Sequence, residues 1–217
     1  MRLNIFLSPN TEIVPYNYQQ KLVGRFHSWL GNNPAHDELS LYSLSWLSHG
    51  KASKKGLNFD EGAYWKISSA DNALLEKLVK GVFNDSKVLC GMEVREMIIQ
   101  EPPDFRDSHT FFAHTPVHIK RSLDDRIKYF YHTDSESGQL LTDTLRNKLK
   151  KAGIDKDCEL SFDQKYPKSR MKGIVYNGLR IKGSLCPVEI KGDPEAIKFA
   201  WSVGIGNSTG IGFGAVS

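Results

Sequence analysis

Two histidines near the N-terminus have side chains and spacing suited to acid–base chemistry. His27 lies at the border of the apolar stripe of a predicted helix, and His36 follows in the loop after Pro34. Imidazole titrates near pH ~6.5, so a pair reached from one helix and its exit loop can supply both a base and an acid. From spacing alone, a histidine at the core edge and a solvated loop histidine remain the simpler interpretation.

Other catalytic and metal-binding patterns have little support. His114 and His118 lie four residues apart on a predicted strand and would share one face, but no acidic residue lies beside them. Neither HExxH nor paired Cys and His at zinc-finger spacing occurs. No kinase motif set and no paired catalytic carboxylates favour a kinase or a glycosidase. We therefore expect no metal and no cofactor.

The C-terminal end is rich in glycine, which permits positive φ angles and close approach to the main chain. The glycines are Gly204, Gly206, Gly210, Gly212 and Gly214. They follow a predicted helix and lack a Gly-Lys-Ser/Thr sequence, so neither a dinucleotide loop nor a P-loop fits. Free backbone N–H groups in such a loop can still hold an anion. We expect an exposed backbone surface for the phosphates of a nucleic acid.

The net charge of +4 is concentrated in the second half of the chain. Between Gln164 and Val188 there are basic residues and no acidic ones. They are Lys165, Lys168, Arg170, Lys172, Arg180 and Lys182. A local basic field fits a phosphate backbone, whereas a strand edge guarded by lysines is an equally good interpretation of this segment alone.

The composition is that of an ordinary globular protein, with 217 residues, 40% hydrophobic and 25% charged. No apolar run approaches the ~18 residues of a membrane helix, and the N-terminus does not resemble a signal peptide. Cys90, Cys158 and Cys186 are too few and too widely spaced for a disulfide set. These features predict a cytoplasmic protein.

The elements that must position these residues follow a β-α-β-β-α-β order in the first half. We predict strands at Arg2–Leu7, Tyr42–Trp46, Gly62–Ser68 and Val88–Gln100, helices at Tyr18–Leu30 and Ala73–Phe83, and a basic loop at Lys51–Lys55. The second half repeats the order more loosely. Its predicted strands are Thr110–Lys120, then Cys158–Phe162, Gly173–Lys182 and Leu185–Ile190, which include a hairpin, and a last short one. Its predicted helices are Gly138–Ala152 and one after Asp193-Pro194. The pattern predicts an α+β fold of tandem ferredoxin-like, RRM-like domains, residues 1–118 and 119–217.

Taken together, these features resemble the CRISPR repeat-processing endoribonucleases, the Cas-six family of the RAMP superfamily. The resemblance rests on the first strand, on Pro15-Tyr16-Asn17 with the helix through His27, on His36-Asp37, and on Thr115-Pro116-Val117. The segment from Gly204 to Val216 is its most specific part, and the match spans almost the whole chain.

The resemblance implies a metal-independent cut within the repeat of precursor CRISPR RNA. Attack by a 2′-hydroxyl would leave a 2′,3′-cyclic phosphate and a 5′-hydroxyl. His36 stands in the place of the family's usual base and His27 in that of an assisting residue, although the two roles could be exchanged. The stabilising cation stays open, because Asp37 follows where family members often have a lysine. Candidates are Arg25, Lys51, Lys54 and Lys55. RNA would bind the basic segment and the glycine segment, including Asn207 and Ser208.

The implied partner is CRISPR repeat RNA, with a second copy of the chain or other Cas proteins as further candidates and no membrane. A non-catalytic crRNA-binding subunit of an effector complex is the main alternative, which the presence of both histidines disfavours. A generic ferredoxin-like RNA-binding module is a weaker one, because the aromatic signature of an RRM is missing.

Overall fold

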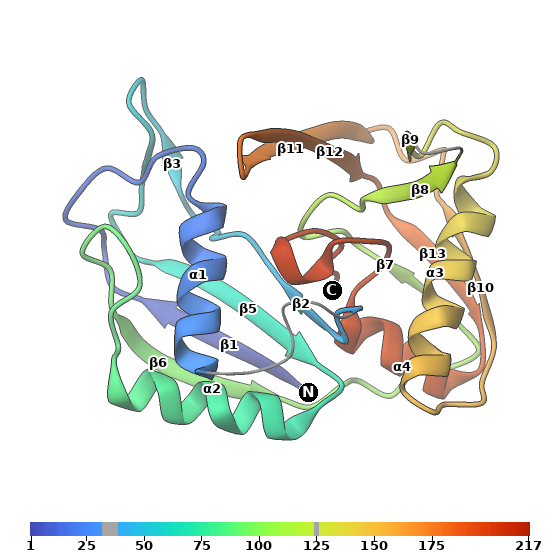
Figure 1. Ribbon diagram of the computed structural model, residues 1–217, viewed down its shortest axis with the longest axis horizontal. Coiled ribbons are helices and arrows are strands. Elements are labelled where there is room, and N and C mark those ends of the chain that lie inside the picture. The colour runs from blue at the N-terminus through green and yellow to red at the C-terminus, as the bar shows by residue number, and fades with distance from the viewer. Residues whose placement is uncertain (32–38, 124–125) are drawn as a thin grey trace.

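The computed structural model describes residues 1–31, 39–123 and 126–217, arranged as two neighbouring halves (Figure 1). In chain order the first half contains β1 (Arg2–Leu7), α1 (Gln19–Leu30), β2 (Tyr42–Leu44), β3 (Lys51–Ala52), β4 (Leu57–Asn58), β5 (Ala63–Ser69), α2 (Asn72–Asn84) and β6 (Val94–Gln100). Its main sheet has the order β2-β5-β1-β6, with every neighbouring pair antiparallel. This is the predicted β-α-β-β-α-β arrangement, with β3 and β4 forming a small extra hairpin.

The apolar pattern of the sequence explains how this half folds. In β1, Leu3, Ile5 and Leu7 are buried on one face of the sheet, and the predicted stripe of α1 packs in the same core. Asp71 is the N-cap of α2, and its side chain accepts a hydrogen bond from the Ala73 N–H over 2.8 Å. A side-chain acceptor at this position satisfies an N–H of the first turn and fixes where the helix begins.

The last strand of this half is shorter than predicted. The sequence predicts a strand from Val88, whereas β6 begins at Val94. Cys90 and Gly91 have φ angles of 49° and 75°, and the Met92 N–H donates to Leu89 O over 2.9 Å. Because extended strand residues have negative φ, this tight turn delays the start of the strand.

The second half has the same plan with two hairpins inserted. Its elements are β7 (Ser108–Phe111), β8 (Ile119–Leu123), β9 (Arg126–Phe130), α3 (Ser137–Lys151), β10 (Cys158–Phe162), β11 (Arg170–Tyr176), β12 (Leu179–Leu185), β13 (Val188–Gly192), α4 (Pro194–Val203) and the 3₁₀ turn η2 (Thr209–Ile211). The sheet order is β10-β13-β7. Two residues beyond β7, Ala113 forms an antiparallel bridge with Val216. Without β8–β9 and β11–β12, the order is again β-α-β-β-α-β, which confirms the predicted tandem ferredoxin-like fold.

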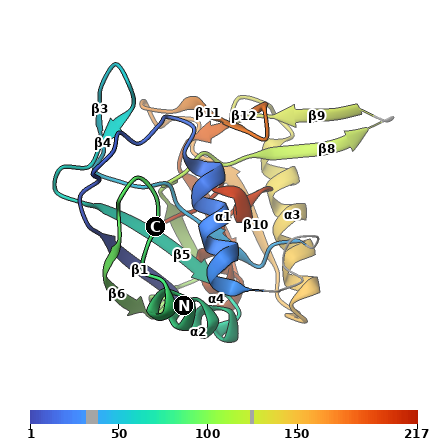
Figure 2. The same cartoon turned by 60° about the vertical axis from the view of Figure 1, so that its left-hand side comes forward.

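Several strand predictions in this half need correction. The strand predicted over Thr110–Lys120 is divided between β7 and β8, and Pro116, which has no N–H to donate, lies in the gap. The predicted hairpin is present as β11–β12, but its turn falls inside Gly173–Lys182, where Asn177 and Gly178 have φ angles of 47° and 75°, the residue types of a type I′ turn. The last short strand is reduced to the bridge at Val216. The β8–β9 hairpin, which extends away from the second half in Figure 2, was not predicted.

Each half has its own hydrophobic core. The first includes buried residues from Leu3 to Met92, and the second those from Phe111 to Val216. Because β7 pairs with β13, the chain enters the second sheet before the boundary expected at residue 118. No helix in the described part of the chain is long and apolar enough to span a membrane.

Candidate nucleic-acid interface

His27 lies in the last turn of α1, at the edge of the first core. Its ring is half-buried and packs edge-on against Phe26, with ring centroids 5.0 Å apart. Phe26 in turn stacks on Tyr42 of β2 at 4.9 Å, which fixes this part of the helix against the sheet. The partial burial expected for His27 is therefore present. His36, the second predicted catalytic residue, lies outside the described residues.

The candidates for the cation that stabilises the transition state lie in two separate places. Lys51, Lys54 and Lys55 lie on the β3–β4 hairpin, which stands beside the first turn of α1 (Figure 1). His27 is eight residues along that helix from its first residue, a distance of about 12 Å at 1.5 Å per residue. The structure does not bring these lysines to His27. Arg25 is closer in sequence, but its Nη1 pairs with Asp85 Oδ2 at 2.7 Å and ties α1 to the end of α2.

The predicted basic segment forms the hairpin β11–β12, which reaches from the second half across to α1. At its turn the Asn177 N–H donates to Gln20 Oε1 over 3.3 Å. Strand alternation divides the basic side chains between two faces of the hairpin. Lys172 lies on the face with buried Ile174, and its Nζ is 5.0 Å from the centroid of the Trp46 ring. Partial burial and the charge of Arg170 lower the pKa of Lys172.

The opposite face of this hairpin carries Arg180 and Lys182. In the β11–β12 register Arg180 pairs with Val175 and Lys182 with Gly173, so both lie on the face that does not contain Lys172. Both side chains are exposed, as are Lys165 and Lys168 in the turns before the hairpin. A nucleic acid lying on one face of the hairpin therefore meets only part of the predicted basic set.

The glycine segment is not the exposed backbone surface that the sequence predicts. All five glycines are buried. Gly212 O accepts a hydrogen bond from Trp46 Nε1 over 2.7 Å, and Thr209 Oγ1 donates to Tyr42 O over 2.8 Å. A Cβ on Gly210 would lie 2.6 Å from Ser40 Oγ, which leaves no room for a side chain. The glycines thus let the segment pack closely between the two halves, and Asn207 and Ser208 are its half-buried members.

Two buried cations fix this junction at the C-terminal end of α4, whose carbonyls carry partial negative charge. Lys148 of α3 is 1% exposed, and its Nζ donates to Val203 O and Gly204 O, each over 3.2 Å. Burial lowers the pKa of Lys148 to about 7. Arg2 of β1 is 3% exposed and donates to Val216 O over 2.6 Å. Its Cζ lies 3.9 Å from the centroid of the Trp201 ring.

A basic hollow of about 450 Å³ lies beside the glycine segment. Lys120, Arg121 and Asn207 line it, together with Thr144 and Asn147 of α3. Asn207 Oδ1 accepts the Lys120 N–H over 2.9 Å and Arg121 Nη1 over 3.3 Å. Burial lowers the pKa of Arg121, while the charge of Asp143 acts in the opposite direction.

Arg121 is held firmly in this hollow. Its Nη2 donates to Leu140 O and, over 2.9 Å, to Thr144 Oγ1. We did not predict Lys120 and Arg121 as site residues, because they fall at the end of an expected strand. Two adjacent cations directly after that strand were the available signal.

His114 and His118 do not share a face as predicted, because the strand expected to hold both is broken between them. His114 Nε2 lies 3.0 Å from Lys66 Nζ of β5. Partial burial of the ring, and then the charges of Lys66 and Arg2, lower the pKa of His114 to about 4. His118 is buried, with Nδ1 2.8 Å from Lys182 O.

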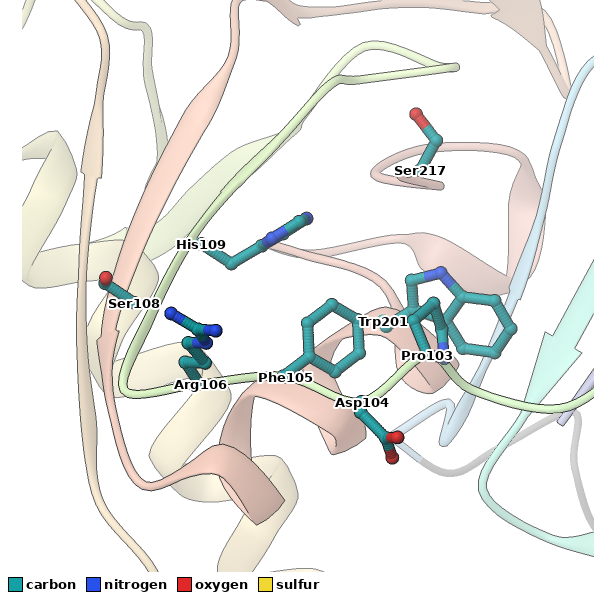
Figure 3. A pocket seen from close by; sticks show the side chains of 8 residues that line it. All are labelled: Pro103, Asp104, Phe105, Arg106, Ser108, His109, Trp201 and Ser217. Carbon is teal, nitrogen blue, oxygen red and sulfur yellow. The ribbon is translucent and has the colours of Figure 1, made fainter.

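A second hollow, of about 380 Å³, lies where the linker between the halves meets β7 and α4. Figure 3 shows the rings of Phe105, His109 and Trp201 gathered around it, with Arg106 beside them. The His109 ring packs edge-on against Phe105 at 4.9 Å, and burial lowers its pKa. None of the predicted site residues lines this hollow.

The C-terminal half of the chain decides the family. Residues 99–217 match the model described as "CRISPR associated protein Cas6, C-terminal". The chain belongs to the Cas6 family. A Cas6 relative from Methanocaldococcus jannaschii, "CRISPR-associated endoribonuclease Cas6 1", is 27% identical over 238 aligned residues, covering 100% of this chain and 92% of the relative.

Solved structures of the Cas6 and RAMP proteins share this fold. One described as "CRISPR associated protein Cas6" matches with a TM-score of 0.83 at 24% identity, covering 100% of this chain and 98% of its own. A Cas6-related protein from Pyrococcus furiosus has a TM-score of 0.85 at 19% identity, with 100% and 97% covered. "An RAMP protein binding different RNA substrates" has a TM-score of 0.84 at 17% identity, covering 100% of this chain and 98% of its own. At these identities the likeness supports the fold.

Proposed function

We propose that this Cas6 protein is an endoribonuclease that cuts precursor CRISPR RNA within its repeats. The alignment along the whole chain with a relative named as a CRISPR-associated endoribonuclease carries the proposal. Membership of the Cas6 family and the basic character of the second half support it.

The RNA lies in the region between α1, the β11–β12 hairpin and the hollow at Arg121. Lys120 and Arg121 offer cations at that hollow, while Asn207 presents a polar side chain from the glycine segment. Contacts between cations and phosphates release counterions, so binding weakens as salt is raised. His27 lies in the last turn of α1, in the first half of the molecule. The glycine segment contacts β2 of the same half through the hydrogen bond from Thr209 to Tyr42 O.

The reaction is a transfer of the phosphate within the RNA, without a metal. One histidine removes the proton from a 2′-hydroxyl, whose oxygen forms a bond to the adjacent phosphorus. The bond from phosphorus to the 5′-oxygen breaks, and the second histidine gives that oxygen a proton. The products are a 2′,3′-cyclic phosphate and a 5′-hydroxyl. His36 and His27 take the two roles, since neutral and protonated imidazoles coexist near neutral pH.

Incubation of the purified protein in EDTA with an end-labelled RNA spanning one repeat tests this function. We expect a single cut with a cyclic phosphate end. A matched RNA with a 2′-deoxy sugar at the cut position should bind equally and stay intact, because the nucleophile is absent. Cleavage only with added divalent metal would overturn the mechanism. Binding without cleavage supports the non-catalytic crRNA-binding subunit instead. If the protein neither binds nor cleaves the RNA, the proposed function is overturned.

The histidine roles require their own variants. His36→Ala should lower the single-turnover cleavage rate by at least about 10²-fold with RNA affinity nearly unchanged, the scale of a lost acid or base. His27→Ala should act in the same direction with a smaller loss. His49→Ala is the matched control, because His49 is exposed and packs on Tyr64 of β5. Unchanged cleavage in both test variants would move the active site elsewhere.

A further inference from the structure

The strand β6 forms an open edge of the first sheet. It is seven residues long and pairs with β1, and within the described residues no strand lies on its other side. The opposite edge, β2, is covered by the glycine segment through the hydrogen bond from Thr209 to Tyr42 O. An open strand of this length presents backbone N–H and C=O groups that can pair with another chain.

Apolar side chains lie on both faces of this edge. Ile99 is 59% exposed and pairs with core residue Leu3, whereas Ile98 is 45% exposed and pairs with Asn4 on the other face. Phe83, at the end of α2, is 80% exposed and lines a mainly apolar hollow of about 400 Å³ together with Ile99. Large apolar side chains gathered at an open edge are typical of a surface that another protein covers.

The edge strand β10 of the second sheet shows the contrast. Its exposed positions are Glu159 and Ser161, so this edge presents a charged and a small polar side chain and no large apolar one, which discourages pairing with another chain. In β6, by contrast, the exposed residues include the large apolar side chains of Ile98 and Ile99. Arg95 and Glu96 precede the apolar centre, and Glu101 follows it.

The charges of β6 select one register for pairing with a second copy. With Ile98 on a two-fold axis, antiparallel pairing places Arg95 opposite Glu101 on both sides of the axis. Opposite charges directly across two strands are favourable, and like charges are unfavourable. Moving the axis half a residue toward the C-terminus would instead place Glu96 opposite Glu101.

We propose that β6 pairs antiparallel with β6 of a second copy of this chain, centred on Ile98. The two four-stranded sheets then join into one, and each copy contributes the same surface, as a two-fold interface requires. Phe83 and the hollow beside Ile99 flank the new strand pair on the helix side of the sheet. This dimer goes beyond the proposed RNA cleavage and does not depend on it.

Cysteine cross-linking tests the register. Opposed residues of an antiparallel pair have Cα atoms about 4.5–5.5 Å apart, within the range of a disulfide. Ile98→Cys should therefore give a covalent dimer on oxidation, seen on a non-reducing gel. Ile99→Cys is the matched control, because position 99 faces Met97 rather than its own copy. The wild-type protein, oxidised in the same way, measures the background cross-linking through half-buried Cys90. Failure of Ile98→Cys, or equal cross-linking of Ile99→Cys, overturns the register.

Sedimentation equilibrium tests the dimer itself. We expect a dimeric wild type, and Ile98→Lys should be monomeric because it places two ammonium groups on the axis. Ile127→Lys on β9, where the isoleucine is 56% exposed, should stay dimeric. Arg95→Glu should weaken the dimer, and Arg95→Glu with Glu101→Arg should restore it. A monomeric wild type, a dimer indifferent to Ile98→Lys, or no restoration by the exchange overturns the proposal.

Discussion

Basic side chains serve opposite purposes at the junction of the halves and on the β11–β12 hairpin. At the junction, Arg2 and Lys148 are 3% and 1% exposed and donate hydrogen bonds to backbone carbonyls near the end of α4. On the hairpin, Arg180 and Lys182 are exposed. A buried cation has lost its water and depends on fixed partners, whereas an exposed one can exchange water for a phosphate.

The comparison shows that residue type alone does not reveal what a cation does. The two junction cations belong to the protein's own architecture, because their acceptors are the carbonyls of α4, of the glycine segment and of the chain end. The hairpin cations remain candidates for RNA. Stability should therefore respond to changes at the junction, and RNA binding to changes on the hairpin.

Arg2→Ala should produce the largest effect, a loss of about 3 kcal/mol in the free energy of unfolding. The change removes the guanidinium from the Trp201 ring and leaves the carbonyl of Val216 without its donor. Urea unfolding measures the loss. Arg180→Ala is the matched arginine control and should change stability by less than about 0.5 kcal/mol. Equal stability of the two variants would contradict the contrast between junction and hairpin.

Gly214→Ala should cost about 2 kcal/mol, while Gly178→Ala should cost about 1 kcal/mol. Both glycines have positive φ, 63° and 75°, so both alanines strain the backbone. At the junction a Cβ on Gly214 would also collide with Ile205 O, whereas nothing lies within 4 Å of a Cβ on Gly178 in the hairpin turn. Thermal unfolding compares them, and equal losses would mean that the glycine segment is not tightly packed.

Lys148→Met should cost about 1–2 kcal/mol at pH 7, because the carbonyls of Val203 and Gly204 lose a donor. The pKa of Lys148 is lowered to about 7 from its ordinary 10.5. Between these values the unfolded chain binds more protons, so wild-type stability rises with pH through this window. The deficit of the variant should therefore grow from pH 7 toward 10, as chemical unfolding at each pH will measure. A constant deficit would contradict the lowered pKa.

Removing both hairpin cations should have the smallest effect on the fold and a clear one on RNA. The double variant Arg180→Ala, Lys182→Ala should lower the slope of log affinity against log salt by about 0.7 for each phosphate of a single-stranded RNA that no longer meets a cation. Its unfolding free energy should stay near that of the wild type. The matched double variant Lys77→Ala, Lys80→Ala on α2 should keep the slope. Filter binding over a salt series distinguishes them, and identical slopes would remove the hairpin from the RNA path.

Local patterns were sufficient for much of the fold. The alternation of Leu3, Ile5 and Leu7 located β1, and the spacing of Leu22, Phe26 and Leu30 located α1. The predicted strand Cys158–Phe162 is β10, residue for residue. The β-α-β-β-α-β order of both halves followed from these elements. Predictions failed where a turn interrupts an apolar run, as at Cys90 and Gly91, because a periodic pattern contains no φ angle.

The candidate site was less predictable, since it depends on contacts between distant residues. Sequence placed His27 correctly at the core edge, while His36 stays a prediction outside the described residues. The lysines of the β3–β4 hairpin are predicted candidates for the stabilising cation, but the fold places them beside the first turn of α1, away from His27 in its last turn. Arg121 directly follows the predicted strand Thr110–Lys120, yet Asn207, far along the chain, completes its hollow.

The sequence by itself determined most of the elements, their order and the family, because apolar periodicity and the glycine segment are local properties of the chain. Tertiary structure alone decided which cations are buried, which glycines face another half, and which strand edge stays open. Burial, close approach and edge pairing are relations between segments far apart in sequence. Arg2 and Arg180 are the same amino acid, and only the tertiary contacts of Arg2, with the Trp201 ring and the Val216 carbonyl, make that arginine structural.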